Sequence, residues 1–175
     1  MTNMVVPIEY LILNICHGYD NDGDDITDFP DTKEDWIMAN FDLAFERTMR
    51  NEGVYSNDPD DAGKETCFGI SRKYHPNWNG WKTVDSLKQS FSTTKTLNNA
   101  LKGNNVLISL VKKFYKENFW DCFELDDCKS NNTAYLMFDT AVNVGKVQAI
   151  KIAQRALGLK ETGRWTLKLL NELVK

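Results

Sequence analysis

A single stretch of turn and strand residues, 55–71, interrupts a chain whose longer segments repeat their apolar residues at helical spacing. The first part of the stretch is rich in Asp, Asn, Pro and Gly and its last part is a short β-like run, which is typical of a hairpin or an extended loop. The remaining pattern predicts helices over 39–52, 105–120, 133–143, 146–157 and 166–174, with short helices in an irregular segment, 72–103. We therefore predict an α+β fold that is predominantly α, with one small β element.

Charge is distributed unevenly along the 175 residues, a length that suffices for one domain with its own core. Residues 1–38 hold nine of the 25 acids and one of the 21 bases, which leaves 20 bases and 16 acids in residues 39–175, a net charge of +4. We therefore expect an acidic N-terminal extension, 1–38, followed by a basic body. A basic body favours a polyanionic partner, although solvated helical faces explain the same charges.

Several classes of protein are disfavoured by what the sequence lacks. No apolar run is long enough to cross a membrane, and the apolar segment 4–15 has no preceding bases, unlike a secretion signal. Two His and four Cys residues do not form a persuasive zinc site, and the acidic segment 20–31 departs from a calcium loop at two defining positions. Cys122 and Cys128 are near enough to pair if the chain turns back between them. We expect no metal and no organic cofactor.

Three polar residues suggest acid–base chemistry: Glu52, Asp61 and Thr66. Glu52 follows Phe45 and Thr48 on the apolar face of its predicted helix, where burial favours a neutral carboxyl and hence a proton donor. Asp61 lies in a polar loop, so we expect it to be ionised and to act as a base, while the Thr66 hydroxyl can hold a water molecule. Glycosidic bond cleavage requires this division of roles. A solvated helix end and a capped turn contain the same residue types, so spacing alone leaves both interpretations open.

The stretch from Glu52 to Ile70 resembles the signature of glycoside hydrolase family 108, which runs approximately E-G-G-Y-x-N-x-P-x-D-x-G-G-x-T-x-x-G-I. Segments between residues 115 and 166 resemble the C-terminal peptidoglycan-type segment of the same family, so the resemblance covers residues 39–175. Val54 and Lys64 stand where the family usually has Gly. Because Val does not readily adopt a positive φ, we expect the backbone after Glu52 to differ slightly, and Lys64 to add a cation to the rim of a groove.

This family comprises N-acetylmuramidases and includes proteins described as secretion activators. The resemblance implies a lysozyme-like fold, with a catalytic region at 39–120 and a helical C-terminal segment, 121–175, packed in the same unit. It further implies cleavage of the β-1,4 bond between N-acetylmuramic acid and N-acetylglucosamine, with Glu52 as the acid. The Glu/Asp/Thr spacing is also similar to that of phage-type lysozymes, which favours Asp61 as the base over Asp58 or Asp60.

Further residues are candidates for binding sugar. Stacking faces or hydrogen bonds for a glycan are expected from Tyr55, Asn57, Tyr74 and Asn143. Ordinary loop packing for the first three, and helix capping for Asn143, are the competing interpretations. Core or structural roles are expected for Trp78, Trp81, Asp139 and Gln154.

We expect the partner to be peptidoglycan glycan strands, with no nucleic acid and no membrane insertion. The protein is expected to be a monomer that acts at the bacterial cell wall, in the periplasm or outside the cell, or that stays in the cytoplasm until it is released as an endolysin. Three alternatives stay open: a lytic transglycosylase, a non-catalytic module that binds the cell wall or assists secretion, and a chitinase or chitosanase.

Overall fold

The computed structural model describes three stretches of the chain, residues 39–49, 54–58 and 64–174. Its contacts divide the chain into two compact units. Within the described residues, the helical unit consists of 39–44 and 117–174, and the sheet unit lies within 45–116. The acidic extension, with its calcium-like segment, lies outside the described residues, and the domain boundary at residue 120 stays a prediction.

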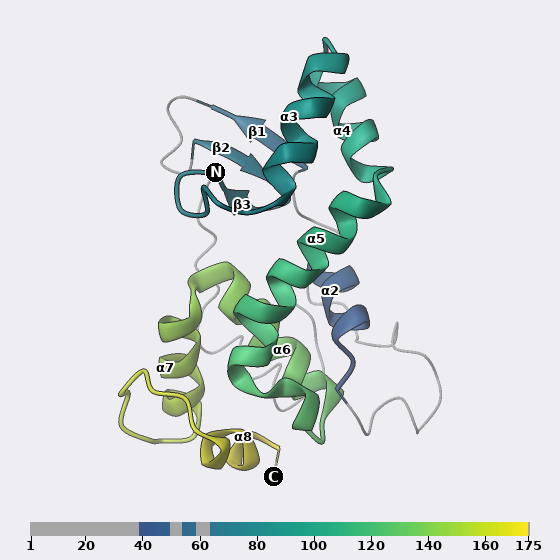
Figure 1. Ribbon diagram of the computed structural model, residues 1–175. Coiled ribbons are helices and arrows are strands. Elements are labelled where there is room, and N and C mark those ends of the chain that lie inside the picture. The colour runs from purple at the N-terminus through teal and green to yellow at the C-terminus, as the bar shows by residue number, and fades with distance from the viewer. Residues whose placement is uncertain (1–38, 50–53, 59–63, 175) are drawn as a thin grey trace. The chain divides into compact units, whose positions relative to one another are not determined.

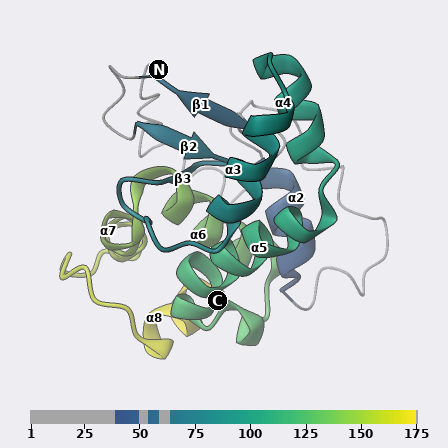
Figure 2. The same cartoon turned by 45° about the horizontal axis from the view of Figure 1, so that its top comes forward.

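The sheet unit contains a three-stranded antiparallel sheet in the order β1–β2–β3 (Figures 1 and 2). Strand β1 (Tyr55–Asn57) pairs with β2 (Glu65–Cys67), which pairs with β3 (Ile70–Ser71). A two-residue turn, Phe68 and Gly69, joins β2 to β3 with φ of 47° and 75°, because a tight hairpin needs left-handed residues at both positions. The predicted hairpin is confirmed, and the structure adds a third strand.

Three helices complete the sheet unit: α3 (Gly80–Ser90), α4 (Thr94–Lys102) and α5 (Asn105–Tyr115), and they pack on one another. Thr93 Oγ1 accepts from the Thr96 amide at 3.3 Å, and Asn104 Oδ1 accepts from the Leu107 amide at 2.9 Å, so side chains cap α4 and α5. The short helices predicted within the segment 72–103 are found as α3 and α4. Both helices bury only narrow apolar stripes.

Helix α5 supplies much of the core of the sheet unit. Leu107, Val111 and Tyr115 are buried and form one face of the helix. The Tyr115 hydroxyl donates to the Phe68 carbonyl at 2.8 Å, which ties the helix to the β2–β3 turn. After Tyr115 the predicted helix continues to Trp120 as a π-helical segment, η1 (Lys116–Trp120).

The helical unit is built on α6 (Asn131–Val144), α7 (Lys146–Ala156) and α8 (Leu167–Leu173). Gly145, with φ of 85°, ends α6 and begins α7, as predicted from its position. Two short 3₁₀ helices, η2 (Asp121–Phe123) and η3 (Leu125–Asp127), precede α6. The three predicted helices are confirmed with small differences at their ends.

Aromatic rings form the centre of the helical unit. Phe41, in α2 (Phe41–Met49), meets Trp120 and Phe138 edge to face, with centroids 5.4 and 5.8 Å away. Trp120 and Phe138 lie 5.8 Å apart, and the Trp120 indole N–H donates to Asp126 Oδ1 at 2.7 Å. Such pairs stabilise by about 0.5–1.5 kcal/mol each beyond their burial, so the start of α2 is firmly held.

The described cysteine thiols are free. Cys122 Sγ donates to the Asn118 carbonyl and Cys128 Sγ to the Ser130 carbonyl, so the two thiols have different partners and form no disulfide. Burial raises the pKa of the Cys67 thiol to about 12, which keeps it protonated.

Gln154 is a satisfied polar group in the core of the helical unit, as predicted. Its amide donates to Thr162 Oγ1 at 2.9 Å and to the Arg164 carbonyl at 3.1 Å, and its Oε1 accepts from the Gly163 amide at 3.0 Å. One buried side chain therefore fastens the loop before α8 to α7.

Replacing Gln154→Leu is expected to lower the free energy of unfolding by about 1–3 kcal/mol, because the loop groups that it satisfies lose their partner. Urea unfolding measures this difference. The matched control is Gln148→Leu, which changes an exposed residue of the same helix and is expected to alter stability by no more than about 0.5 kcal/mol. Equal effects of the two substitutions would contradict the assignment.

Candidate functional site

The predicted site residues differ in how far the structure places them. Glu52 and Asp61 lie outside the described residues. Thr66 is the central residue of β2, with Tyr55 in the neighbouring strand β1. Asn143 lies in the last turn of α6 in the helical unit. The structure therefore relates Thr66 and Tyr55 directly, while the roles of Glu52 and Asp61 stay predictions.

Thr66 lies in a row of three hydroxyl side chains on one face of the sheet. The register pairs Ser56 with Thr66 and Thr66 with Ser71, and paired residues share a face. Thr66 Oγ1 donates to the Lys64 carbonyl at 3.3 Å. Because the hydroxyl is the donor in that bond, its lone pairs can accept hydrogen bonds from water or a sugar. This row was not predicted, because it depends on the register of three strands.

Tyr55 and Asn57 lie on the opposite face of the sheet from Thr66. The register pairs Tyr55 with Cys67 and Asn57 with Glu65, and successive residues of a strand point to opposite faces. The Tyr55 hydroxyl donates to Glu65 Oε1 at 2.8 Å, and burial raises its pKa. The structure thus does not bring Tyr55 and Asn57 onto the face that carries the Thr66 hydroxyl.

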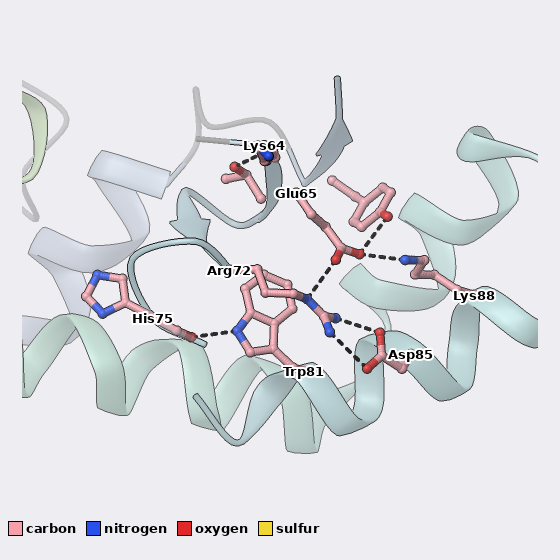
Figure 3. A network of polar contacts seen from close by, with 9 residues as sticks. Lys64, Glu65, Arg72, His75, Trp81, Asp85 and Lys88 are labelled. Carbon is pink, nitrogen blue, oxygen red and sulfur yellow. Dashed lines mark hydrogen bonds and ion pairs between the residues drawn. The ribbon is translucent and has the colours of Figure 1, made fainter. Parts of the chain in front are cut away.

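Glu65 is the centre of an ion-pair network on this second face (Figure 3). Its Oε1 pairs with Lys88 Nζ at 2.6 Å, and its Oε2 pairs with Arg72 Nε at 2.7 Å. Only 14% of the Glu65 side chain is exposed. Two cations and the Tyr55 hydroxyl therefore surround one largely buried carboxylate, which keeps its charge compensated.

Arg72 connects Glu65 to helix α3. Its two terminal nitrogens donate to the carboxylate oxygens of Asp85 at 2.6 and 3.1 Å, and its guanidinium lies 4.3 Å from the ring centroid of Trp81. Trp81 is buried, as predicted, and its indole N–H donates to the His75 carbonyl at 2.8 Å. A planar guanidinium can meet two carboxylates and a ring face together, a geometry that a lysine does not reproduce.

The charges of the network support one another. Hydrogen bonds from Arg72 lower the pKa of the Asp85 carboxyl, and the hydrogen bond to Glu65 raises the pKa of the Lys88 amine. Asp85 is therefore ionised and Lys88 protonated at neutral pH. The network was not predicted from the sequence, because its members belong to different elements. The only local signal is that Glu65 stands two residues before the buried Cys67 in the same strand.

The other candidate binding residues have distinct surroundings. Tyr74 is 63% exposed, and Lys73 Nζ lies 5.2 Å from its ring centroid. Asn143 donates from Nδ2 to the Asp139 carbonyl at 2.9 Å and to Asp139 Oδ2 at 3.2 Å, so its side chain bonds back to the preceding turn of its own helix, while Gly145 caps that helix. Among the described residues, no group of three or more His, Cys, Asp or Glu side chains is placed to hold a metal ion, and no helix could span a bilayer.

Lys64 has a left-handed backbone, with φ of 53°. The motif that this stretch resembles has Gly at this position, and Gly adopts such a conformation without steric cost. Val54, at the other position where this chain departs from a Gly of the motif, is buried, and its carbonyl accepts from the Phe68 amide at 2.7 Å.

Comparison with known proteins finds a matching family model and a similar solved structure. The family model Glycosyl hydrolase 108 matches residues 45–145, more than half of the chain. A solved structure of SagA from Brucella abortus is similar, with a TM-score of 0.50 and 24% sequence identity over 77% of this chain and 67% of that chain. No curated protein matches. The predominantly α, α+β fold is of the lysozyme-like type, as predicted.

Lys64→Gly is expected to raise the free energy of unfolding by roughly 0.5–1 kcal/mol. Relief of the left-handed strain is worth about 1–2 kcal/mol, and the greater freedom of Gly in the unfolded chain offsets about 0.5–1 kcal/mol of it. Urea unfolding of both proteins measures the change. Lys64→Ala removes the same charge but keeps the strain, so it should not stabilise; stabilisation by both variants would attribute the effect to the charge.

Proposed function

Because the chain belongs to the glycosyl hydrolase 108 family, we propose that it hydrolyses peptidoglycan by cleaving the β-1,4 bond between N-acetylmuramic acid and N-acetylglucosamine. The family is one of glycosidases, so the substrate class is carbohydrate. The observation that carries the proposal is the family match over residues 45–145, the span that contains Glu52, Asp61 and Thr66. The basic body, with its net charge of +4, suits an anionic wall polymer.

Glu52 is proposed as the general acid. Helix α2 supports this role, since Phe45 and Thr48 are 6% and 8% exposed, and the helix predicted from the sequence over 39–52 puts Glu52 on the same stripe. A carboxyl on a buried stripe holds its proton more readily than a solvated one. In the reaction, Glu52 donates that proton to the oxygen of the glycosidic bond as the bond to the anomeric carbon breaks.

Asp61 is proposed as the base and Thr66 as the residue that orients water. The attacking water forms a bond to the anomeric carbon and gives its proton to Asp61, so that one water molecule is consumed for each bond cleaved. The role of Thr66 is supported by its hydroxyl, which donates to the Lys64 carbonyl with an Oγ1–O distance of 3.3 Å. The hydroxyl oxygen can therefore accept a hydrogen bond from water.

Sugar contacts are proposed for Tyr74 and for the hydroxyl row of Ser56, Thr66 and Ser71. Tyr74 is exposed and offers a ring face for stacking on a sugar. Tyr55, Asn57 and Asn143 are retained as proposed binding residues whose contacts with sugar are untested. We further propose that the protein acts as a monomer at the cell wall.

Glu52→Gln is expected to abolish clearing of peptidoglycan in a zymogram, with a loss in rate of about 10²–10⁴-fold, because the amide cannot donate the proton. Glu46→Gln is the matched control, since Glu46 is an exposed carboxylate of α2, close to Glu52 in the sequence. Clearing by the wild type and by Glu46→Gln but not by Glu52→Gln supports catalysis. No clearing by any of the three, with all of them folded, would favour a wall-binding or secretion-assisting module.

Asp61→Asn is expected to lower the rate by a similar factor of roughly 10²–10⁴, while Asp58→Asn and Asp60→Asn retain activity. Mass spectrometry of digested sacculi should find reducing ends, because water is the nucleophile. Products with 1,6-anhydro ends, together with a fully active Asp61→Asn, would instead identify a lytic transglycosylase. Preferential cleavage of soluble chitooligosaccharides would indicate a chitinase.

A further inference from the structure

We propose that Glu65 is a positioning residue that sets the orientation of the Thr66 hydroxyl by holding strand β2 from the opposite face of the sheet. The inference rests on the proposed function of Thr66 in the same site. It assigns Glu65, Arg72 and Lys88 a part in the reaction without contact with the substrate.

Strand β2 is paired along both edges, and Glu65 supplies the side-chain contacts that join it to α3. The strand has three residues, and Cys67 is its only fully buried side chain. Glu65, in contrast, makes three charged or polar side-chain contacts of 2.6 to 2.8 Å, with Lys88, Arg72 and Tyr55. Lys88 belongs to α3, and Arg72 binds Asp85 of α3, so the carboxylate connects the strand to that helix.

Arg72 restrains this contact through several partners. Arg72 is held by the Asp85 carboxylate, by Glu65 and by the face of Trp81 at once. The Arg72 amide also donates to the Glu65 carbonyl at 2.8 Å, so main chain and side chain of the two residues are joined. An arginine with three fixed partners has little freedom to let the strand rotate or slide.

The contacts of Glu65 with Arg72, Lys88 and Tyr55 act on Thr66 through the backbone of β2. Glu65 separates Lys64, whose carbonyl accepts the Thr66 hydroxyl, from Thr66 itself. Because adjacent side chains of a strand point to opposite faces, rotation of Glu65 about the strand axis turns Thr66 by the same amount. Lys64 is strained, with φ of 53°, so this segment needs an external restraint to keep its conformation.

Glu65 is not itself suited to be the base. Its two oxygens are engaged by two cations and a hydroxyl, and its side chain lies on the face opposite Thr66. The arrangement therefore favours a role in positioning.

A double-mutant cycle with Glu65→Gln and Thr66→Ala tests the inference in the full-length chain. Glu65→Gln is expected to lower kcat by about 10- to 100-fold with little change in KM, because misplacement of a reacting group affects mainly the chemical step. In the Thr66→Ala background the same substitution should cost less than about twofold, because the group it positions is already absent. Soluble glycan strands and a reducing-end assay give both constants.

Controls separate positioning from loss of folding. Assays are run below the midpoint of thermal unfolding of every variant, and Arg72→Lys, which keeps the charge but not the three contacts, should reproduce the drop in kcat and the same non-additivity. Glu161→Gln removes the partner of Arg155 in the helical unit and should leave kcat unchanged. If Glu65→Gln does not fold, Lys88→Met removes one contact and takes its place in the cycle.

The outcomes are distinct. An active wild type in which the losses from Glu65→Gln and Thr66→Ala multiply overturns the positioning role and leaves the proposed function intact. An unchanged kcat in Glu65→Gln does the same. A folded wild type that cleaves no glycan overturns the proposed function, and the inference with it.

Discussion

The ion pairs of Glu65 are the side-chain interactions that join the central strand of the sheet to helix α3. Strand β2 is too short to be held by apolar burial, since Cys67 alone is fully covered. The carboxylate of Glu65 instead connects the strand to α3 through Arg72 and Lys88. Because the carboxylate is largely shielded from solvent, these pairs are screened less than surface pairs, and removal of one partner leaves a charge uncompensated. The remaining contacts of Arg72, with Asp85 and Trp81, depend on the same guanidinium.

One face of the sheet carries the Glu65 network, and the opposite face carries a row of three hydroxyl side chains. Ser56, Thr66 and Ser71 form a row of hydroxyls that can donate and accept hydrogen bonds, as recognition of a sugar requires. Left-handed non-glycine residues, Lys64 and Phe68, flank the central strand on both sides. A strained backbone conformation persists only where the surrounding contacts hold it in place. The contacts of Glu65 with Arg72 and Lys88, together with the hydrogen bond from Tyr115 to Phe68, supply that restraint.

The success of prediction varied along the chain for identifiable reasons. The helices over 105–120 and 133–157 were predicted because their apolar stripes are wide and end at clear signals such as Gly145. The short helices within 72–103 were predicted without their bounds, because α3 and α4 bury few apolar residues among many polar ones. Glu65 received no role, because an acidic residue on a short strand has no local pattern that distinguishes a network from solvent.

The sequence alone determined the family, the order of the main elements, and the identity of Glu52, Asp61 and Thr66 as candidates, because motifs and periodicity are local properties of the chain. Only the tertiary structure decided which residues share a face. Tyr55 lies with Glu65 and not with Thr66, since strand register sets the face of every side chain and a shift of one residue would reverse it. The partners of Glu65 were decided there too, because ion pairs form between side chains that folding brings within a few ångströms, whatever their separation along the chain.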